Sequence, residues 1–330
     1  MERVSLNLLS RGLLSALICL AAGGVMADEA AQVARRDAEW LRRVQRSREA
    51  LEWSDALVQH DWRLQARPTD GRCRILDPAD TVVREGTAEE CRTAFERLDR
   101  QGTIPTVQGP TVLVLHGLGE GRASMRPLVE HLRQTLDATV LFFGYASTQA
   151  DIETHGRSLG GVIAGLPEAA RISFVGHSLG NLVVRRWMTL AQESDLARVD
   201  RMVMLGPPNQ GSDLARRVAG VQFLAGLAEG AARDLVVDWH KVAPQLAVPP
   251  CEFGIVAGGR GDSSGYSPLL EGDDDAVVRV EETRLDGAHD FLLLPVHHAA
   301  MLRDPKVQRA TEAFLKAGRF ADADGAGTAE

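Results

Sequence analysis

The chain has 330 residues, 45% of them hydrophobic, which is enough for one large domain or two modest ones. Its formal net charge of −8 argues against nucleic acid or an anionic membrane surface as a partner. The sequence has no His-x-x-x-His motif and no clustered Cys/His spacing. We therefore expect neither a metal ion nor another cofactor.

The first 27 residues have the features of a secretory signal peptide. Arg3 and Arg11 supply positive charge, and an apolar run from Leu13 to Ala22 follows. Val25–Ala27 then forms a small-residue cleavage site before Asp28. Because the apolar run is shorter than a membrane span, we expect cleavage and export to the periplasm or the medium. If the segment stayed uncleaved, it would anchor the protein in the membrane.

Residues 28–105 are predicted to form an N-terminal extension of helices and a hairpin. Apolar residues recur at helical spacing from Val33 to Val58, which indicates a long amphipathic helix. Two runs, 61–66 and 73–76, flank a Pro-Thr-Asp-Gly turn and predict a β-hairpin. Residues 88–98 predict a second helix. Nothing in this extension carries catalytic chemistry, so we expect its apolar stripe to serve packing.

Three cysteines follow the signal segment. In an oxidising compartment Cys73 and Cys91 are the natural pair for a disulfide, because both lie in the extension. The alternative is three unpaired thiols, with Cys251 on a buried strand. The sequence does not choose between the two.

Residues 106–318 have the pattern of an α/β domain. Short apolar runs alternate with helix-length segments, as in βαβ units, which predicts a mostly parallel sheet flanked by helices. The predicted strands are Thr111–Leu115, Thr139–Phe143, Arg171–Val175, Arg201–Leu205, Cys251–Ala257 and Asp290–Val296. A linker rich in Gly and Pro, Gln101–Pro110, leads into this domain. Residues 319–330 are small and acidic, which predicts a flexible tail.

The pattern Gly-x-Ser-x-Gly occurs three times, and its surroundings distinguish the copies. A nucleophilic serine needs a sharp turn between a strand and a helix, where glycines let the backbone pass close to its neighbours. The copy around Ser158 has no strand before it, and the copy around Ser263 has no helix after it. The copy around Ser178 follows strand 171–175 and precedes a predicted helix over 181–188. Ser178 is therefore the predicted nucleophile; the alternative is a glycine turn with an inert serine.

An acyl-serine mechanism also needs backbone N–H groups that point at the oxyanion of the tetrahedral intermediate. Leu179 follows the nucleophile at a helix N-terminus, where free donors and the helix dipole favour an anion. We assign the second donor to Leu118, in the glycine-containing segment after strand 111–115. His116 lies before the serine in the chain, so we expect it to shape this loop and not to act as the base.

In the strand–turn–helix context of Ser178, the acid and then the base follow the nucleophile along the chain. We choose Asp275 as the acid, next to apolar Ala-Val-Val, with Asp262 as the alternative. The other aspartates of the Asp273–Asp275 run are expected to lie in a solvated turn, because like charges this close disfavour sharing a site. The base is expected in the pair His297 and His298, after the last strand. His240 and His289 are expected to be ordinary histidines.

At this point the chain resembles bacterial lipase- and esterase-like α/β-hydrolases over about residues 110–310. The resemblance depends on six segments: Val-Leu-Val-Leu-His-Gly (112–117), Tyr-Ala-Ser-Thr (145–148), Gly-His-Ser-Leu-Gly-Asn (176–181), Leu-Gly-Pro-Pro-Asn-Gln-Gly-Ser (205–212), Asp-Asp-Ala-Val-Val (274–278) and His-Ala-Ala-Met-Leu-Arg-Asp-Pro (298–305). It implies Ser178, Asp275 and His298 as the triad. It prefers His298 because the family histidine precedes a similar segment. One departure is Ala276, where such lipases usually carry glycine.

An insertion over about 210–250 contains several apolar residues, including Val221, Phe223 and Trp239. In lipase-like folds a cap at this position covers the serine, and an apolar underside would favour acyl chains. The alternative is a pair of amphipathic helices packed beside the sheet.

The sequence thus predicts a serine hydrolase of carboxylic esters, acting on a small-molecule or lipid ester, with transient contact with a lipid interface. Acyl transfer to another alcohol needs the same residues. A non-catalytic exported binding protein on a degenerate hydrolase fold is the alternative from another class. The sequence does not indicate the oligomeric state.

Overall fold

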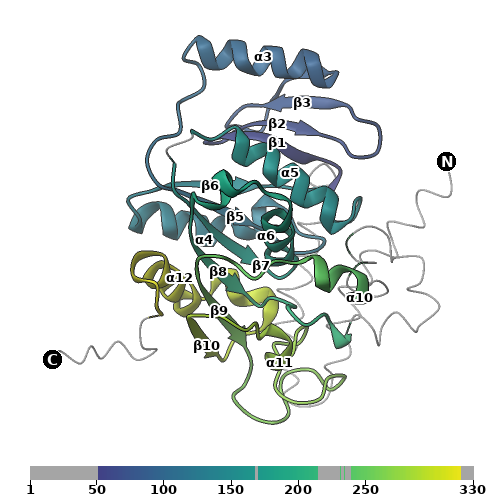
Figure 1. Ribbon diagram of the computed structural model, residues 1–330, viewed down its shortest axis with the longest axis vertical. Coiled ribbons are helices and arrows are strands. Elements are labelled where there is room, and N and C mark those ends of the chain that lie inside the picture. Colours follow the sequence, from purple (N-terminus) through teal and green to yellow (C-terminus); the bar gives the residue numbers. More distant parts are fainter. Residues whose placement is uncertain (1–50, 168–169, 215–230, 232–233, 235–238, 321–330) are drawn as a thin grey trace.

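The computed structural model describes residues 51–167, 170–214, 231, 234 and 239–320. Within them the chain forms two sheets: a four-stranded sheet in the order β1-β2-β3-β4 and a six-stranded sheet in the order β10-β9-β8-β7-β5-β6. Figure 1 shows the small sheet next to the β6 edge of the large one.

Every neighbouring pair in the six-stranded sheet is parallel, as the sequence predicts. The strands are β5 (Thr111–Leu115), β6 (Thr139–Phe143), β7 (Ile172–His177), β8 (Val199–Leu205), β9 (Glu252–Gly258) and β10 (Asp290–Leu294). The segments between and after them contain α4 (Arg122–Thr135), α5 (Ile152–Ala164), α6 (Leu179–Leu190), α7 (Glu193–Leu196), α10 (Trp239–Val242), the 3-10 helix Ala243–Gln245, α11 (Val280–Thr283), the 3-10 helix His298–Arg303 and α12 (Pro305–Ala317).

The sheet is apolar on both faces because helices cover both of them. Side chains alternate along a strand, so Leu113 and Leu115 of β5 pack with α5 and α6, while Val112 and Val114 pack with α4 and α12. This two-sided burial explains the nearly continuous apolar runs in the sequence. The carboxyl ends of the parallel strands all lie at one edge, where their following loops meet.

The N-terminal extension is a small antiparallel sheet with one helix packed against it. Its elements are β1 (Ser54–Gln59), β2 (Trp62–Ala66), β3 (Cys73–Leu76), β4 (Val82–Gly86) and α3 (Ala88–Arg100). The hairpin and the helix over 88–98 are as predicted. The predicted long helix is wrong at its C-terminal end, because Val58 lies in β1; its residues before 51 lie outside the described part. Pairing with β2 and docking on α5 outweigh the local helical periodicity.

Cys73 and Cys91 are buried in the core of this small unit, together with Leu64, Ile75 and Phe95. Both are free thiols in the structure. Burial raises the pKa of each thiol. Cys251 is also free, and it immediately precedes β9.

The small sheet is tied to the α/β domain by hydrogen bonds at the end of β6. The N–H of Asp55 donates to the carbonyl of Gly144 over 2.8 Å, and the N–H of Gly144 donates to the Asp55 carboxylate over 2.7 Å. The N–H of Ala146 donates to Ser54 Oγ over 3.0 Å. The extension therefore supports the segment that follows β6.

Most of the predicted cap lies outside the described residues, including Val221 and Phe223, whereas Trp239 begins α10. The tail prediction is wrong at Phe320, which is buried and stacks on Phe314 of α12 with ring centroids 5.0 Å apart. Residues 321–330 and the predicted signal segment also lie outside the described part. Among the described residues, no helix has the length and apolarity needed to span a bilayer.

Candidate active site

Ser178 lies on a sharp turn between β7 and α6. Its backbone has φ 51° and ψ −121°, a region that L-residues rarely adopt and that costs about 1–3 kcal/mol. Its N–H donates to the carbonyl of Leu205 at the end of β8, over 2.9 Å. The side chain is partly exposed, in contrast to the fully buried residues on both sides of it. The turn thus lifts one hydroxyl above the sheet edge.

The second glycine of the motif is required by a close approach between the start of α6 and the end of β5. A Cβ on Gly180 would lie 2.8 Å from the carbonyl oxygens of both Leu115 and His116. The other two copies of the motif lack this geometry. Ser158 lies within α5 and donates to the carbonyl of Thr154, and Ser263 lies in an exposed loop.

The loop after β5 is held from the side by the segment after β6. The N–H of Gly119 donates to Ser147 Oγ over 2.9 Å, and the Tyr145 hydroxyl donates to the carbonyl of His116 over 2.6 Å. Among the described residues, the backbone N–H groups of Leu118 and Leu179 have no acceptor. Leu179 is also the first residue of α6. The Tyr-Ala-Ser-Thr segment therefore positions the loop that carries one predicted oxyanion donor.

His116 is fully enclosed and shapes this loop, as predicted. Its Nδ1 lies 2.8 Å from the carbonyl of Gly117, and its Nε2 accepts the N–H of Tyr145 over 3.2 Å. The ring stacks on Tyr145 with centroids 4.3 Å apart. Burial lowers the pKa of His116, so the ring is neutral and donates from Nδ1.

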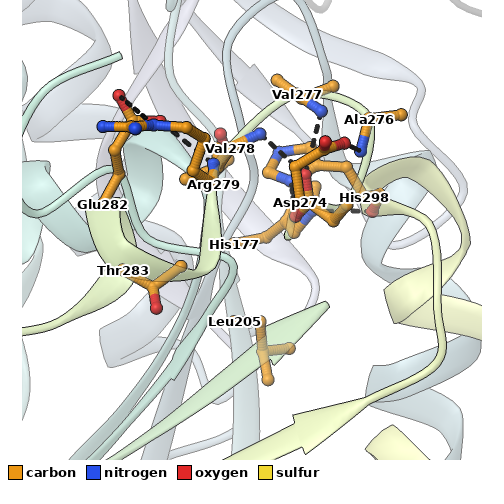
Figure 2. Close-up of polar contacts among 12 residues, drawn as sticks. His177, Leu205, Asp274, Ala276, Val277, Val278, Arg279, Glu282, Thr283 and His298 are labelled. Carbon is orange, nitrogen blue, oxygen red and sulfur yellow. Dashed lines mark hydrogen bonds and ion pairs between the residues drawn. The ribbon is translucent and has the colours of Figure 1, made fainter. Parts of the chain in front are cut away.

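The structure pairs Asp275 with His298. The Oδ2 atom of Asp275 lies 2.6 Å from Nδ1 of His298, and the N–H of His298 donates to the carbonyl of Asp275 over 2.8 Å. The other carboxylate oxygen, Oδ1, accepts the N–H groups of Val277 and Val278 over 3.0 and 2.7 Å. Figure 2 shows His298 beside this turn, with His177 next to it.

The alternative acid and base lie elsewhere. Asp262 is exposed and holds its own turn, accepting the N–H groups of Ser264 and Gly265. The ring of His297 stacks on Tyr266 with centroids 3.9 Å apart. His289 lies edge-on to Phe253, and His240 is an exposed residue of α10.

The side chain of His298 lies at the ends of β7 and β8, close to the serine turn. Its ring packs against His177, the residue before Ser178, with centroids 4.7 Å apart. A Cβ on Gly206, after β8, would lie 3.0 Å from His298 Nδ1 and 3.2 Å from Asp275 Oδ2. Among the described contacts, no hydrogen bond joins Ser178 Oγ to His298. Such bonds are often long in ligand-free enzymes and tighten with substrate.

The prediction that the remaining aspartates lie in a solvated turn is wrong at Asp274. Asp274 is fully buried, and its Oδ1 accepts the N–H groups of Tyr266, Ser267 and Ala276. Burial raises the pKa of Asp274 to about 6, although the backbone hydrogen bonds from Tyr266, Ser267 and Ala276 lower it in part. Asp273 accepts the N–H groups of Arg260 and Gly261. Backbone donors thus let two adjacent carboxylates, Asp274 and Asp275, be fully buried, whereas Asp273 remains half-buried.

Sequence reasoning missed a buried ion pair behind the site. His177 Nδ1 lies 3.2 Å from Glu120 Oε2, and its Nε2 lies 3.2 Å from the carbonyl of His298. Both ring nitrogens face acceptors, so only the imidazolium satisfies both. Burial alone would lower the pKa of His177, but the Glu120 carboxylate outweighs it and the pKa is raised.

Glu120 is held as a carboxylate by the same pair. Burial alone would raise its pKa, but His177 and the N–H of Gly117 hold the pKa of Glu120 at about 2. Ser124 Oγ also donates to it, over 2.9 Å. The one sequence feature that pointed to this pair was His177 in the serine motif. Its partner Glu120 lies 57 residues earlier in the chain, so sequence alone did not reveal the contact.

Comparisons with known proteins agree with this architecture. Residues 111–216 match the family described as "Putative serine esterase (DUF676)". No curated protein matches the sequence. The mature form of Bacillus licheniformis lipase BlEst2 is 16% identical, with a TM-score of 0.51 over 66% of this chain and 96% of its own. Its propeptide form is also 16% identical, with a TM-score of 0.51 over 68% of this chain and 54% of its own.

The parallel six-stranded sheet, its covering helices and these likenesses define an α/β-hydrolase. The fold is thus that of the α/β-hydrolases, and residues 111–216 are similar to a serine-esterase family. The family match spans the loop after β5 and the turn at Ser178, which supports a serine hydrolase.

Proposed function

We propose that the protein hydrolyses carboxylic esters through an acyl-serine intermediate. In this mechanism Ser178 Oγ attacks the ester carbonyl while Nε2 of His298 takes its proton. Asp275 receives the hydrogen bond from Nδ1 and stabilises the imidazolium that forms. The backbone N–H groups of Leu118 and Leu179 bind the oxyanion. His298 then protonates the leaving alcohol. In the second half of the reaction His298 takes a proton from water, the water attacks the acyl-serine, and the proton returns to Ser178 Oγ as the acid leaves.

The observation that carries this proposal is the combination of the strained turn at Ser178 with the buried Asp275–His298 pair at the same sheet edge. A structural serine has no need of φ 51°. A histidine held by a carboxylate at 2.6 Å on one ring nitrogen leaves the other nitrogen available for proton transfer.

The decisive experiment is active-site labelling with a fluorophosphonate probe, followed by peptide mapping. We expect one labelled serine, Ser178, and no label in Ser178→Ala. The variant should lose at least about 10⁴-fold in kcat on p-nitrophenyl esters, because the nucleophile is removed. Its melting temperature should be close to that of the wild type, because alanine keeps the Cβ and only the hydroxyl of a partly exposed residue is removed. Label on Ser158 or Ser263 would contradict the assignment.

The dependence of the rate on acyl-chain length would identify the class of ester that the protein hydrolyses. The rates for p-nitrophenyl acetate, butyrate, octanoate and palmitate should separate a short-chain esterase from a lipase. A rise in rate with chain length would support a lipid ester and transient contact with a lipid interface. Glycerol or methanol added as a second acceptor would reveal acyl transfer as an additional ester product.

We also propose that the protein is exported. The support is the arrangement of charge, apolar run and small residues within 1–27.

A further inference from the structure

The structure contains a cavity of about 600 Å³ that adjoins the loop after β5 through His116 and Glu120. It lies between the small N-terminal sheet and the beginning of α4, and it is lined by residues of both, such as Gln65 and Gly121. Neither Ser178 nor His298 is among the described lining residues. Its volume is in the range of small-molecule binding sites. The Ser178 mechanism does not use this space.

The walls of the cavity carry an excess of positive charge. Among the described residues, six arginines line it, against four acidic side chains. The arginines are Arg63, Arg74, Arg122, Arg126, Arg133 and Arg303. Asp61 bridges Arg122 and Arg133 over 3.1 and 3.2 Å, and Asp80 pairs with Arg63. Asp61 and Asp80 therefore hold three of the six guanidinium groups in place, whereas Glu120 pairs with His177.

Two of these guanidinium groups have buried nitrogens without a partner among the described residues. They are Nε of Arg63, whose side chain is only 5% exposed, and Nη1 of Arg122. Burial and the nearby charge of Arg63 lower the pKa of Arg122 to about 10, although Asp55 and other acids act against this. A buried donor left unsatisfied is costly, so buried donors in native structures nearly always have a partner, which can be protein, water or a bound ion.

The N-terminus of α4 lines the same cavity. Gly121 is the N-cap and supplies no side-chain hydrogen bond, and Gly121, Arg122, Ala123 and Ser124 all line the space. The first helical N–H groups of a 14-residue helix and its dipole favour an anion there.

From these three features we propose that the cavity binds a phosphate group, carried either by a small soluble molecule or by a lipid headgroup. The guanidinium groups of Arg63 and Arg122 donate to its oxygens, together with the N–H groups at the start of α4. Planar guanidinium groups and a helix N-terminus are the donors that bind phosphate most often. A phosphate monoester carries about −1.5 to −2 charges at pH 7, which suits the positive excess of the walls.

The test is binding of inorganic phosphate and glycerol 3-phosphate to the full chain, measured by isothermal titration and thermal shift. Sodium chloride at matched ionic strength is the reference. We expect saturable binding and a rise in melting temperature that chloride does not reproduce. The Arg126→Gln change alters an exposed lining residue and should leave the fold intact, while weakening binding by about threefold. Arg122→Gln should weaken it by about tenfold or more, because a buried charged donor is lost.

Arg157→Gln is the matched control, because Arg157 is an exposed α5 residue that pairs with Glu153 and does not line the cavity. It should bind phosphate like the wild type. Vesicles of phosphatidic acid, compared with phosphatidylcholine vesicles, separate the two sources of the group. Binding to the vesicles alone would assign a lipid headgroup, and binding to the soluble probes would assign a small molecule. Affinity equal in wild type, Arg126→Gln and Arg122→Gln, or no saturable binding to any probe, would overturn the proposal.

Discussion

The contacts around Ser178 hold its backbone in the strained conformation. Its N–H bonds the carbonyl of Leu205, and Gly180 lets the ends of β5 and α6 approach within contact distance. The strain is thereby balanced by packing in the core. The surrounding contacts therefore orient the Ser178 side chain, whereas the residues on both sides of it are buried.

Asp275 is the residue whose role is most sharply testable. Its replacement in Asp275→Asn keeps an oxygen for the N–H groups of Val277 and Val278 but removes the charge that orients His298. We expect kcat to fall by about 10³–10⁴-fold, as for other triads that lose this charge. Esterase kinetics and the melting temperature check the effect. Asp262→Asn is the control, and a similar loss in that variant would contradict the assignment.

Ala276 has φ 82°, in the left-handed region that favours glycine. The chain thus carries a strained alanine beside its proposed acid. The Ala276→Gly change should stabilise the protein by about 0.5–1 kcal/mol, because relief of about 1–2 kcal/mol of strain exceeds the added chain entropy. Thermal unfolding measures it. Ala94→Gly, in α3, should instead destabilise by about 1 kcal/mol. Destabilisation in both variants would contradict the strain argument.

At the element scale, the loop after β5 joins two parts of the site. Its backbone carries the Leu118 N–H, and its end carries Glu120, which holds His177 beside His298. Ser147 and Tyr145 of the segment after β6 hold the same loop from the other side. The small N-terminal sheet bonds that segment in turn. Neighbouring strand ends thus position the site through chains of hydrogen bonds.

The Glu120–His177 pair should make stability depend on pH within a defined window. The pKa of Glu120 is lowered from 4.5 to about 2, so its contribution is present above pH 4.5 and is lost as the pH falls toward 2. The pKa of His177 is raised above 6.5, so its contribution is present below pH 6.5 and is lost as the pH rises through the folded value.

Glu120→Gln should therefore lower the free energy of unfolding most between about pH 4.5 and 6.5, by about 2–3 kcal/mol. The difference from wild type should shrink on both sides of this window. Urea unfolding from pH 3 to pH 8 measures it. Glu96→Gln removes an exposed carboxylate of α3 and should show no such window. A pH-independent difference for Glu120→Gln would show that the pair is not ionised as proposed.

At the scale of the whole molecule, the described chain is one α/β-hydrolase sheet with an antiparallel unit at its β6 edge (Figure 1). The arginine-lined cavity lies where these two units meet. The extension thus has a structural role in supporting the segment after β6, and a wall of the proposed phosphate site is built from it.

Export is the prediction that belongs to the whole chain. Expressed in a Gram-negative host, the protein should be found in the periplasm or the medium with Asp28 as its N-terminal residue, because cleavage after Ala27 is expected. Deletion of residues 2–27 should retain it in the cytoplasm. Fractionation and N-terminal sequencing measure both. An intact N-terminus in the membrane fraction would instead support an anchor.

Local pattern alone determined the parallel strands, the helix at 88–98 and the turn at Ser178. Each of these depends on periodicity or on glycines within a few residues, and burial on both faces of a sheet leaves a clear apolar run. The choice of Asp275 also came from local sequence, namely its apolar neighbours.

Only the tertiary structure decided the contacts between distant segments. It joined His298 to Asp275, His177 to Glu120 and the small sheet to Gly144. It also buried the adjacent Asp274 and Asp275, and it placed a strand where the sequence has helical periodicity. The physical reason is the same in each case: hydrogen-bond partners and burial come from residues far away in the chain, and these outweigh the preference that a short segment has by itself.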